Sequence, residues 1–283
     1  MSTLIDDATT DHLLRNLVIP PRPGVLDKIA ALRRQPDLEL GEIAEVLTED
    51  LALTAAMLKA ANSPLIGQGR KIASVPQALS LLGVNNTLNL LNGLAVRAAL
   101  TAQMPPTLEV FWERAMTIAS VAGALCEQLE GVPDEAQSFA LFHGCGVAIM
   151  LMQMPDYVRT QRLIALARDG QIPKIEVQLH HTSNNVVGYL VARTWLMPEA
   201  FAQAILQQYN LGLFRGEEGL DASGKLMIAI TRAARNVWRT LTDSKGDPGW
   251  EEAGPLVLGY LGLNDCEFED WRDEMHQRIH EGG

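Results

Sequence analysis

The chain has 283 residues, enough for one large domain or two modest ones with a substantial buried core. Hydrophobic residues make up 47% of it and aromatic residues only 5%, which favours helices packed through Leu, Ala and Val side chains. The formal net charge of −11 argues against a surface that binds duplex DNA, because phosphate contacts need a dense field of Lys and Arg side chains.

The cysteines and the N-terminal residues indicate the compartment. Cys126, Cys145 and Cys266 lack the spacing of a zinc site or of a disulfide framework, which fits a reducing environment. The first residues, MSTLIDDATTDHLL, contain acids where a signal peptide has a basic stretch and an apolar run. No apolar run approaches the roughly 20 residues that a bilayer span requires. We therefore expect a cytoplasmic protein that does not enter a membrane.

Almost every long segment repeats its apolar residues at the spacing of an α-helix. In the first third of the chain, Asp50 is placed to cap the helix that follows it. The next helix has a start and a stop signal: Ser74 and Gln77 have the spacing of a capping box, and Gly83 suits a left-handed position at the end. A further helix is predicted over residues 87–100.

The same pattern continues through the middle of the chain. Helices are predicted over residues 111–129 and 135–154, and helical periodicity extends to residue 210. No run of alternating β-branched residues is bounded by turn residues, so strands are not expected. The sequence predicts an all-α fold.

The last quarter of the chain begins with a stretch rich in glycine and acids, residues 211–224, where we expect a long loop or a boundary. Three more helices are predicted after it. The last helix places four apolar side chains on one stripe: Phe268, Trp271, Met275 and Ile279. We expect this stripe to pack on the core, and the alternative is a surface around Trp271 that contacts a partner.

The motif LFHGCG, residues 141–146, poses the question of whether His143 is a metal ligand or the base of a catalytic cysteine. On one continuous helix, residues two apart point about 200° away from each other, so His143 and Cys145 are not expected to form a nucleophile–base pair. Cys145 is interpreted as a small packing residue. The adjacent His180 and His181 lie on different faces and are weak evidence for a metal site.

An asparagine stripe lies on the helix around residue 90. Asn85 and Asn86 occupy a position that resembles the turn of a helix-turn-helix unit, whose second helix reads DNA. Arg97 is the only cation of that second helix, however, which is too few to hold phosphates. We instead consider the stripe as a candidate protein-interaction surface, formed by Asn85, Asn89 and Asn92.

Several separate stretches occur in a characteristic order. They are IPPRPGVLDKIAAL, PDLELGEIAEVLTEDLALTAAMLKAANSP, RKIASVPQALSLLGVNNTLNLLNGLAV, FWERAMTIAS, FALFHGCGVAIM and VVGYLVARTWLMPEAFAQAI. Together they resemble the HDOD family, the HD-related output domain of bacterial signalling proteins. The resemblance departs from the family at Leu51, where proline is usual after aspartate.

The resemblance implies a fold and a division of the chain. Residues 12–210 would form an HDOD-like domain, with an N-terminal helical part over 12–105 packed on a degenerate HD-like bundle over 106–210. Residues 211–283 would be a C-terminal helical extension, which is short for an independent domain and is expected to pack on the bundle.

The family is related to the HD metal-dependent phosphohydrolases, in which histidines and aspartates bind a divalent cation that activates water. The corresponding positions of this chain are Arg114, His143, Gly144, Asn184 and Gln208, with the terminal aspartate near Thr231. One imidazole cannot hold the cation, and an arginine at a ligand position repels it. The resemblance therefore implies no bound metal, no cofactor and no metal-dependent hydrolysis.

A polar cleft that contains Arg114 would remain. Either this arginine pairs with an internal acid, as a buried charge requires, or the cleft binds an anionic small molecule such as a nucleotide. The resemblance implies a non-catalytic signalling module that contacts other signalling proteins and neither nucleic acid nor membrane. The alternatives are an anion sensor and a metal-dependent phosphohydrolase with an unorthodox site.

Overall fold

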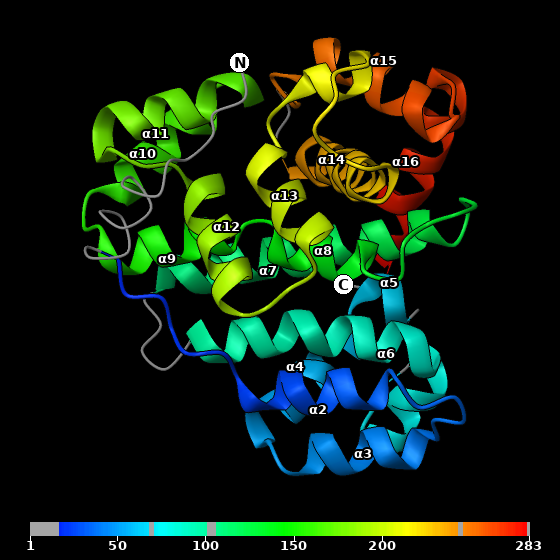
Figure 1. Ribbon diagram of the computed structural model, residues 1–283. Helices are drawn as coiled ribbons and strands as arrows, with labels where there is room; N and C mark the ends of the chain where they lie inside the picture. The colour runs from blue at the N-terminus through cyan, green and yellow to red at the C-terminus, as the bar shows by residue number, and fades with distance from the viewer. Residues whose placement is uncertain (1–16, 68–70, 101–105, 243–245, 282–283) are drawn as a thin grey trace.

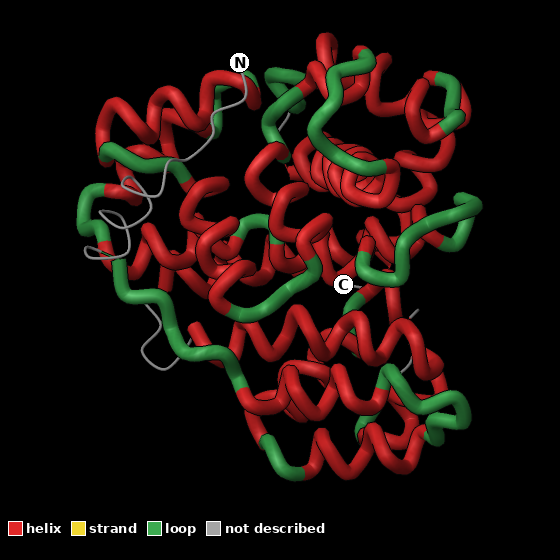
Figure 2. Tube along the Cα trace, viewed as in Figure 1, coloured by secondary structure: helices red, strands yellow, loops and turns green. Residues whose placement is uncertain are grey.

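The structure is a computed structural model, and it describes residues 17–67, 71–100, 106–242 and 246–281. Every regular element within these ranges is a helix, and they contain no strand (Figures 1 and 2). The prediction of an all-α fold is therefore confirmed.

The N-terminal helices form one layer, at the bottom of Figure 1. Its longest helix, α6, packs against α2, α3 and α4. The bounds of the layer are α2 (Gly24–Leu32), α3 (Leu40–Thr48), α4 (Leu51–Ala61), α5 (Pro64–Gly67) and α6 (Val75–Leu100).

Local sequence signals start two helices of this layer as predicted, but the predicted stop is not an end of a helix. The Leu53 N–H donates to Asp50 Oδ1 at 3.0 Å, and the Gln77 N–H donates to Ser74 Oγ at 3.4 Å. Each side chain satisfies a backbone donor that the first turn of a helix leaves free. The stop predicted at Gly83 is a kink inside α6, where this residue has a φ of 72° that glycine adopts without steric cost.

Three helices cross the middle of the molecule, drawn in green in Figure 1. In this layer α7 packs against α8, which in turn packs against α6 below it. The bounds are α7 (Pro106–Cys126), α8 (Ala136–Phe142) and α9 (Cys145–Gln153).

The prediction of one continuous helix over residues 135–154 is wrong, because the chain breaks at His143 and Gly144. Gly144 has φ −91° and ψ 9°, outside the α-helical range. A Cβ atom at this position would lie 3.0 Å from Cζ of Phe111. The glycine therefore lets the backbone at the break pack directly against an aromatic ring of α7. His143 and Cys145 thus belong to different helix ends, and Cys145 is fully buried.

One stretch of the described chain, Ala136–Gln153, has the length and composition of a membrane span, although no such run was expected from the sequence. It comprises α8 and α9, and 78% of it is buried inside the fold. The core helices of globular proteins meet the same criterion, so this stretch is weak evidence for a membrane segment.

Two pairs of helices follow. The helices α10 and α11, at the upper left of Figure 1, pack against each other. A small apolar cluster of Ile164, Ala167 and Ile172 lies in this region. The helix α12 packs against both α9 and α13. The bounds are α10 (Tyr157–Ile164), the 3-10 turn η1 (Asp169–Gln171), α11 (Ile172–His180), α12 (Asn184–Thr194) and α13 (Glu199–Gln207).

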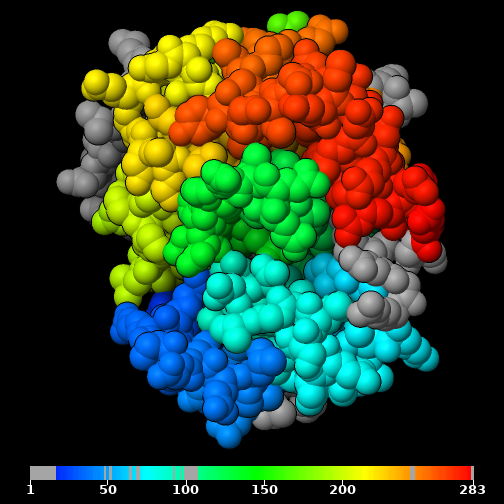
Figure 3. Space-filling model, turned by 90° about the vertical axis from the view of Figure 1, so that its right-hand side faces the viewer, coloured from blue at the N-terminus to red at the C-terminus, as the bar shows by residue number. Residues whose placement is uncertain are grey.

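The C-terminal helices complete the main core. The long helix α14 packs against α7, α8, α13 and α15, and α16 packs against α5 and α14. Figure 3 shows the C-terminal segment in orange above the green middle layer and in red at the right-hand side of that layer. The bounds are η2 (Leu211–Arg215), α14 (Ala222–Thr242), α15 (Trp250–Leu261) and α16 (Asp265–Glu281).

The apolar stripe of the last helix faces inwards. Phe268, Trp271 and Met275 are buried, so the stripe packs on the core as expected. The alternative of a partner surface around Trp271 is corrected, because its side chain is 6% exposed.

The helices α9 and α12 approach each other closely just after the break at Gly144. A Cβ atom at Gly146 of α9 would lie 1.9 Å from the backbone oxygen of Asn184 and 2.7 Å from the backbone nitrogen of Gly188, both on α12. Only glycine at position 146 permits this contact, and a Cβ at Gly188 would lie 2.9 Å from Cγ2 of Ile205.

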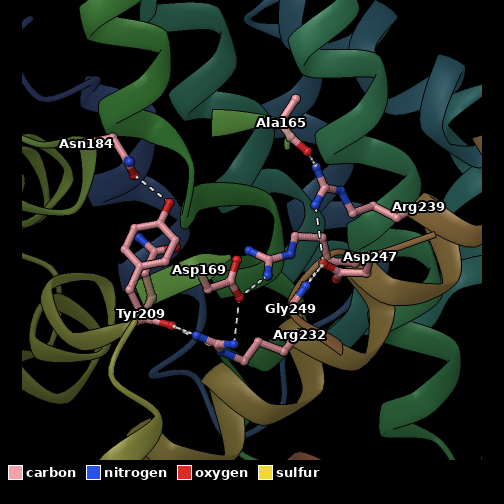
Figure 4. Close-up of polar contacts among 10 residues, drawn as sticks. Ala165, Asp169, Asn184, Tyr209, Arg232, Arg239, Asp247 and Gly249 are labelled. Atoms are coloured by element: carbon pink, nitrogen blue, oxygen red, sulfur yellow. Dashed lines mark hydrogen bonds and ion pairs between the residues drawn. The ribbon is translucent and has the colours of Figure 1, made fainter. Parts of the chain in front are cut away.

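Buried ion pairs hold η1 against α14. Asp169 Oδ2 accepts from Arg232 Nη1 at 2.6 Å and also from Arg235 Nη2 (Figure 4). Arg232 Nη2 donates to the backbone oxygen of Gln208 at 2.8 Å, beyond the end of α13. Side-chain exposure is 6% for Asp169 and 4% for Arg232, so these charges depend on each other rather than on water.

We predict that Gly146→Ala lowers the free energy of unfolding by about 1–3 kcal/mol, because the added methyl group forces α9 and α12 apart. Urea denaturation followed by circular dichroism measures the change. The matched control is Gly259→Ala in α15, where a Cβ meets nothing within 4 Å and alanine is expected to stabilise the helix by up to about 1 kcal/mol. Equal effects of the two substitutions would contradict the close approach.

We predict that Asp169→Asn lowers the free energy of unfolding by about 3–5 kcal/mol, because it leaves two buried guanidinium groups without their carboxylate. Burial alone raises the pKa of Asp169, but the charges of Arg235 and Arg232 outweigh it and lower that pKa. Stability from this carboxylate is therefore present above the unfolded-state pKa of about 3.9 and is lost as the pH falls through the folded-state pKa.

The difference between wild type and Asp169→Asn should accordingly shrink below about pH 4 in denaturation curves. The control is Asp273→Asn, whose carboxylate is 72% exposed and pairs with Arg272 on the surface. It should change the free energy of unfolding by less than about 1 kcal/mol. A similarly small effect at position 169 would rule out the buried pairs as a structural link.

Candidate functional site

A pocket of about 100 Å³ lies where α7, the break before α9, α10, η1 and α14 meet. Three residues that the sequence singled out line it, namely Arg114, His143 and Gly144. The other polar or aromatic lining residues are Phe111, Gln161, Asp169, Tyr209, Arg235, Trp238 and Arg239.

Arg114 comes from α7 and is held between two aromatic rings. Its Cζ atom is 5.4 Å from the ring centroid of Phe111 and 5.4 Å from that of Trp238. Such contacts stabilise a guanidinium group through its faces. Among the described residues no carboxylate forms an ion pair with it, so the expectation that Arg114 pairs with an internal acid is wrong.

The surroundings of Arg114 are cationic. Burial, together with the nearby charges of Arg235 and Arg239, lowers the pKa of Arg114 to about 10. The guanidinium group still carries its proton at neutral pH. The pocket therefore contains a positive charge that no acid of the described chain pairs with.

His143 ends α8 and faces the same pocket. Its Nδ1 atom lies 2.7 Å from the backbone oxygen of Ala140, and its own backbone oxygen accepts from Gln208 Nε2 at 3.1 Å. Burial lowers the pKa of His143 to about 4, and the charges of Arg235 and Arg114 act in the same direction. The imidazole is therefore neutral at pH 7 and hydrogen-bonded within the fold.

Asn184 and Gln208 lie behind the pocket rather than in its lining. Asn184 Nδ2 donates to Glu176 Oε2 at 2.8 Å, and Asn184 Oδ1 accepts from the Tyr209 hydroxyl at 3.1 Å (Figure 4). Glu176 is fully buried and also accepts from the Tyr157 hydroxyl, and burial raises its pKa. Asn184 thus supports the tyrosine wall of the pocket.

The candidate residues outside the cleft are not brought together. Asn85 is exposed, but Asn89 is 7% exposed and accepts from Arg33, and the side chain of Asn92 lies outside the described part of the structure. Asn89 therefore cannot belong to a surface stripe, because it is packed into the fold. Thr231 is buried on α14.

The sequence interpretation missed the residues that define the charge of the pocket. Arg232, Arg235 and Arg239 follow one another at i, i+3 and i+7, which places them on one face of α14. That spacing was a visible signal, whereas nothing local marks Asp169 as their partner. Arg239 donates to the backbone oxygen of Ala165 at 2.7 Å and pairs with Asp247 at 3.3 Å (Figure 4).

The donor set does not fit a divalent cation. The one carboxylate of the lining, Asp169, is bound by two arginines, and His143 is engaged through Nδ1. Gly144 has no side chain, and the described residues contain no group of three or more His, Cys, Asp or Glu able to hold a metal. The pocket and its immediate surroundings contain a cluster of four arginines and two aspartates: Arg114, Arg232, Arg235, Arg239, Asp169 and Asp247. This arginine–aspartate cluster therefore has an excess of two positive charges.

Comparison with known proteins supports the fold. The structure is similar to an HDOD domain protein of unknown function from Geobacter sulfurreducens, with a TM-score of 0.70 and 20% identity over 96% of this chain and 94% of that one. It is also similar to a putative signal transduction protein from Marinobacter aquaeolei VT8, with a TM-score of 0.69 and 24% identity over 93% of this chain and 58% of that one.

A curated relative, an uncharacterized protein of Treponema pallidum, is 22% identical over 197 residues. The matched part is 68% of this chain and 38% of that protein, so the chain spans well under half of the relative's length. The HDOD domain family matches residues 19–211, which is more than half of the chain. The family resemblance seen in the sequence is thereby confirmed, and the protein belongs to the HDOD family.

Proposed function

We propose that this protein is a non-catalytic signal-transduction module, in which the pocket of the HD phosphohydrolases has lost its metal chemistry. The observation that carries the proposal is the pair of arginines, Arg114 and Arg235, in the pocket where a hydrolase of that class requires anionic or neutral ligands. Two positive charges in the lining of one pocket oppose the binding of a divalent cation there. A neutral His143 alone supplies no alternative.

The proposed output is contact with other signalling proteins in the cytoplasm. Eight large apolar side chains are exposed among the described residues, and four of them belong to α10, the turn after it and α11. These four are Leu163 (56% exposed), Leu166 (70%), Val177 (48%) and Leu179 (50%). Leu163 and Leu166 are three residues apart at the end of α10, so these two exposed apolar side chains lie close together and favour a protein-interaction surface there.

Metal-dependent hydrolysis is the competing function, and it is directly testable. We predict that protein purified without chelators contains no stoichiometric transition metal by elemental analysis. We also predict no hydrolysis of bis-p-nitrophenyl phosphate with added Mn²⁺ or Mg²⁺. One or more equivalents of metal, with turnover that His143→Ala abolishes, would contradict the proposal.

The interaction surface can be tested with a photo-crosslinking amino acid at position 166 in cells of the native host. We predict discrete adducts with one or a few proteins, because Leu166 is 70% exposed and follows the exposed Leu163 by three residues. The control places the same amino acid at Glu218, an exposed polar position near η2. Identical adduct patterns at both positions would count against α10 and α11 as the contact surface.

A further inference from the structure

The arrangement of Arg114 leaves its hydrogen-bonding edges unused. A guanidinium group has five N–H donors in its plane and no acceptor. Phe111 and Trp238 approach at 5.4 Å from the guanidinium carbon, and no hydrogen bond to an acceptor occupies its N–H groups among the described residues. Arg114 is half-buried and lines the pocket, so an anion there can accept from its N–H groups without competing with a protein acceptor.

Arg235 also lines this pocket and carries a donor that has no partner. Its Nη2 group binds Asp169, but its Nε–H is buried and has no partner among the described side chains. Arg239 adds a third positive charge to the lining while its Nη groups are held by Ala165 and Asp247. The pocket thus combines donor groups with an uncompensated positive field.

We propose that this pocket binds the phosphoryl group of a small molecule, with Arg114 as its main ligand. The inference rests on the proposed loss of the metal centre, because the same space cannot also hold a divalent cation and its ligands.

The charge and size of a phosphoryl group match the pocket. A phosphate monoester carries about −1.5 to −2 charges at pH 7 and three strong acceptor oxygens. The arginine–aspartate cluster has an excess of two positive charges, and its pocket measures about 100 Å³. Binding would give the N–H donors of Arg114 an acceptor through charge-assisted hydrogen bonds, and the charge of Arg235 in the same lining would attract the anion.

An adjoining groove of about 590 Å³ gives an organic part of the ligand a place to lie. It shares Phe111, Arg114, Gln161 and Trp238 with the arginine pocket. Ala165 is also common to both, and the groove's own apolar lining residues are Val110, Leu151 and Val158. An organic phosphate can therefore place its anion among the arginines and its apolar or planar part along Trp238, whereas free phosphate would use the first pocket alone.

The test is isothermal titration calorimetry of the full chain in chloride buffer at about pH 8, where a phosphate monoester is dianionic. Inorganic phosphate and adenosine monophosphate are the two probes. We expect saturable binding, weakened roughly tenfold or more in Arg114→Gln. The matched control is Arg193→Gln, which removes a surface arginine that also lies over a ring, 6.0 Å from the centroid of Tyr189. It should bind both probes as the wild type does.

A thermal denaturation series separates ligand binding from a structural role of Arg114. Without phosphate, Arg114→Gln should be at least as stable as the wild type, because it removes a charge that Arg235 and Arg239 repel. Phosphate should raise the Tm of the wild type and of Arg193→Gln but not that of Arg114→Gln. The inference would be overturned if Arg114→Gln had a lower Tm than the wild type without phosphate and if phosphate raised the Tm of both proteins equally.

The two probes identify the source of the phosphoryl group. Tighter binding of adenosine monophosphate than of phosphate supports an organic phosphate that uses the groove, and equal binding supports free phosphate. Metal-free protein that binds neither probe would overturn this inference and leave the proposed function intact. Stoichiometric metal in the same samples would overturn the proposed function itself.

Discussion

The ion pairs of Asp169 with Arg232 and Arg235 are the interaction on which the pocket depends. They join η1 to α14 across a separation of 63 residues, and Arg232 also binds the chain just after α13 through the backbone of Gln208. Because these charges are almost fully withdrawn from water, η1 and α14 cannot separate without exposing or stranding them. The positions of Tyr209, Trp238 and Arg239 along one side of the pocket follow from this link.

The same cluster determines the electrostatics of the site. Asp169 is committed to its two arginines, so its charge does not compensate that of Arg114, which instead lies between aromatic rings. Burial, together with the positive charges of Arg235 and Arg114, lowers the pKa of His143 and keeps its imidazole neutral. This excess of positive charge is the basis of the proposal that the pocket binds an anion rather than a cation.

Much of this character comes from outside the region that the family shares. The HDOD match ends at residue 211, whereas Arg235, Trp238 and Arg239 belong to α14 beyond it. That helix packs on α7 and α8 as an integral part of the core. The segment after the family region therefore contributes the rings and charges that complete the pocket, and related chains with other residues there would have a pocket of different charge.

The sequence by itself determined the features that depend on neighbouring residues. Helical spacing of apolar residues and the caps at Asp50 and Ser74 were visible in it, and so was the interest of Arg114 and Gly144, which line one pocket. Only the tertiary structure decided the break at His143, the burial of Asn89 and Trp271, and the pairing of Asp169 with α14. The physical reason is that burial and ion pairing depend on which distant segments come into contact. Local periodicity does not specify those contacts. A helical pattern shows which residues share a face, whereas the neighbours of that face are chosen by the packing of the whole chain.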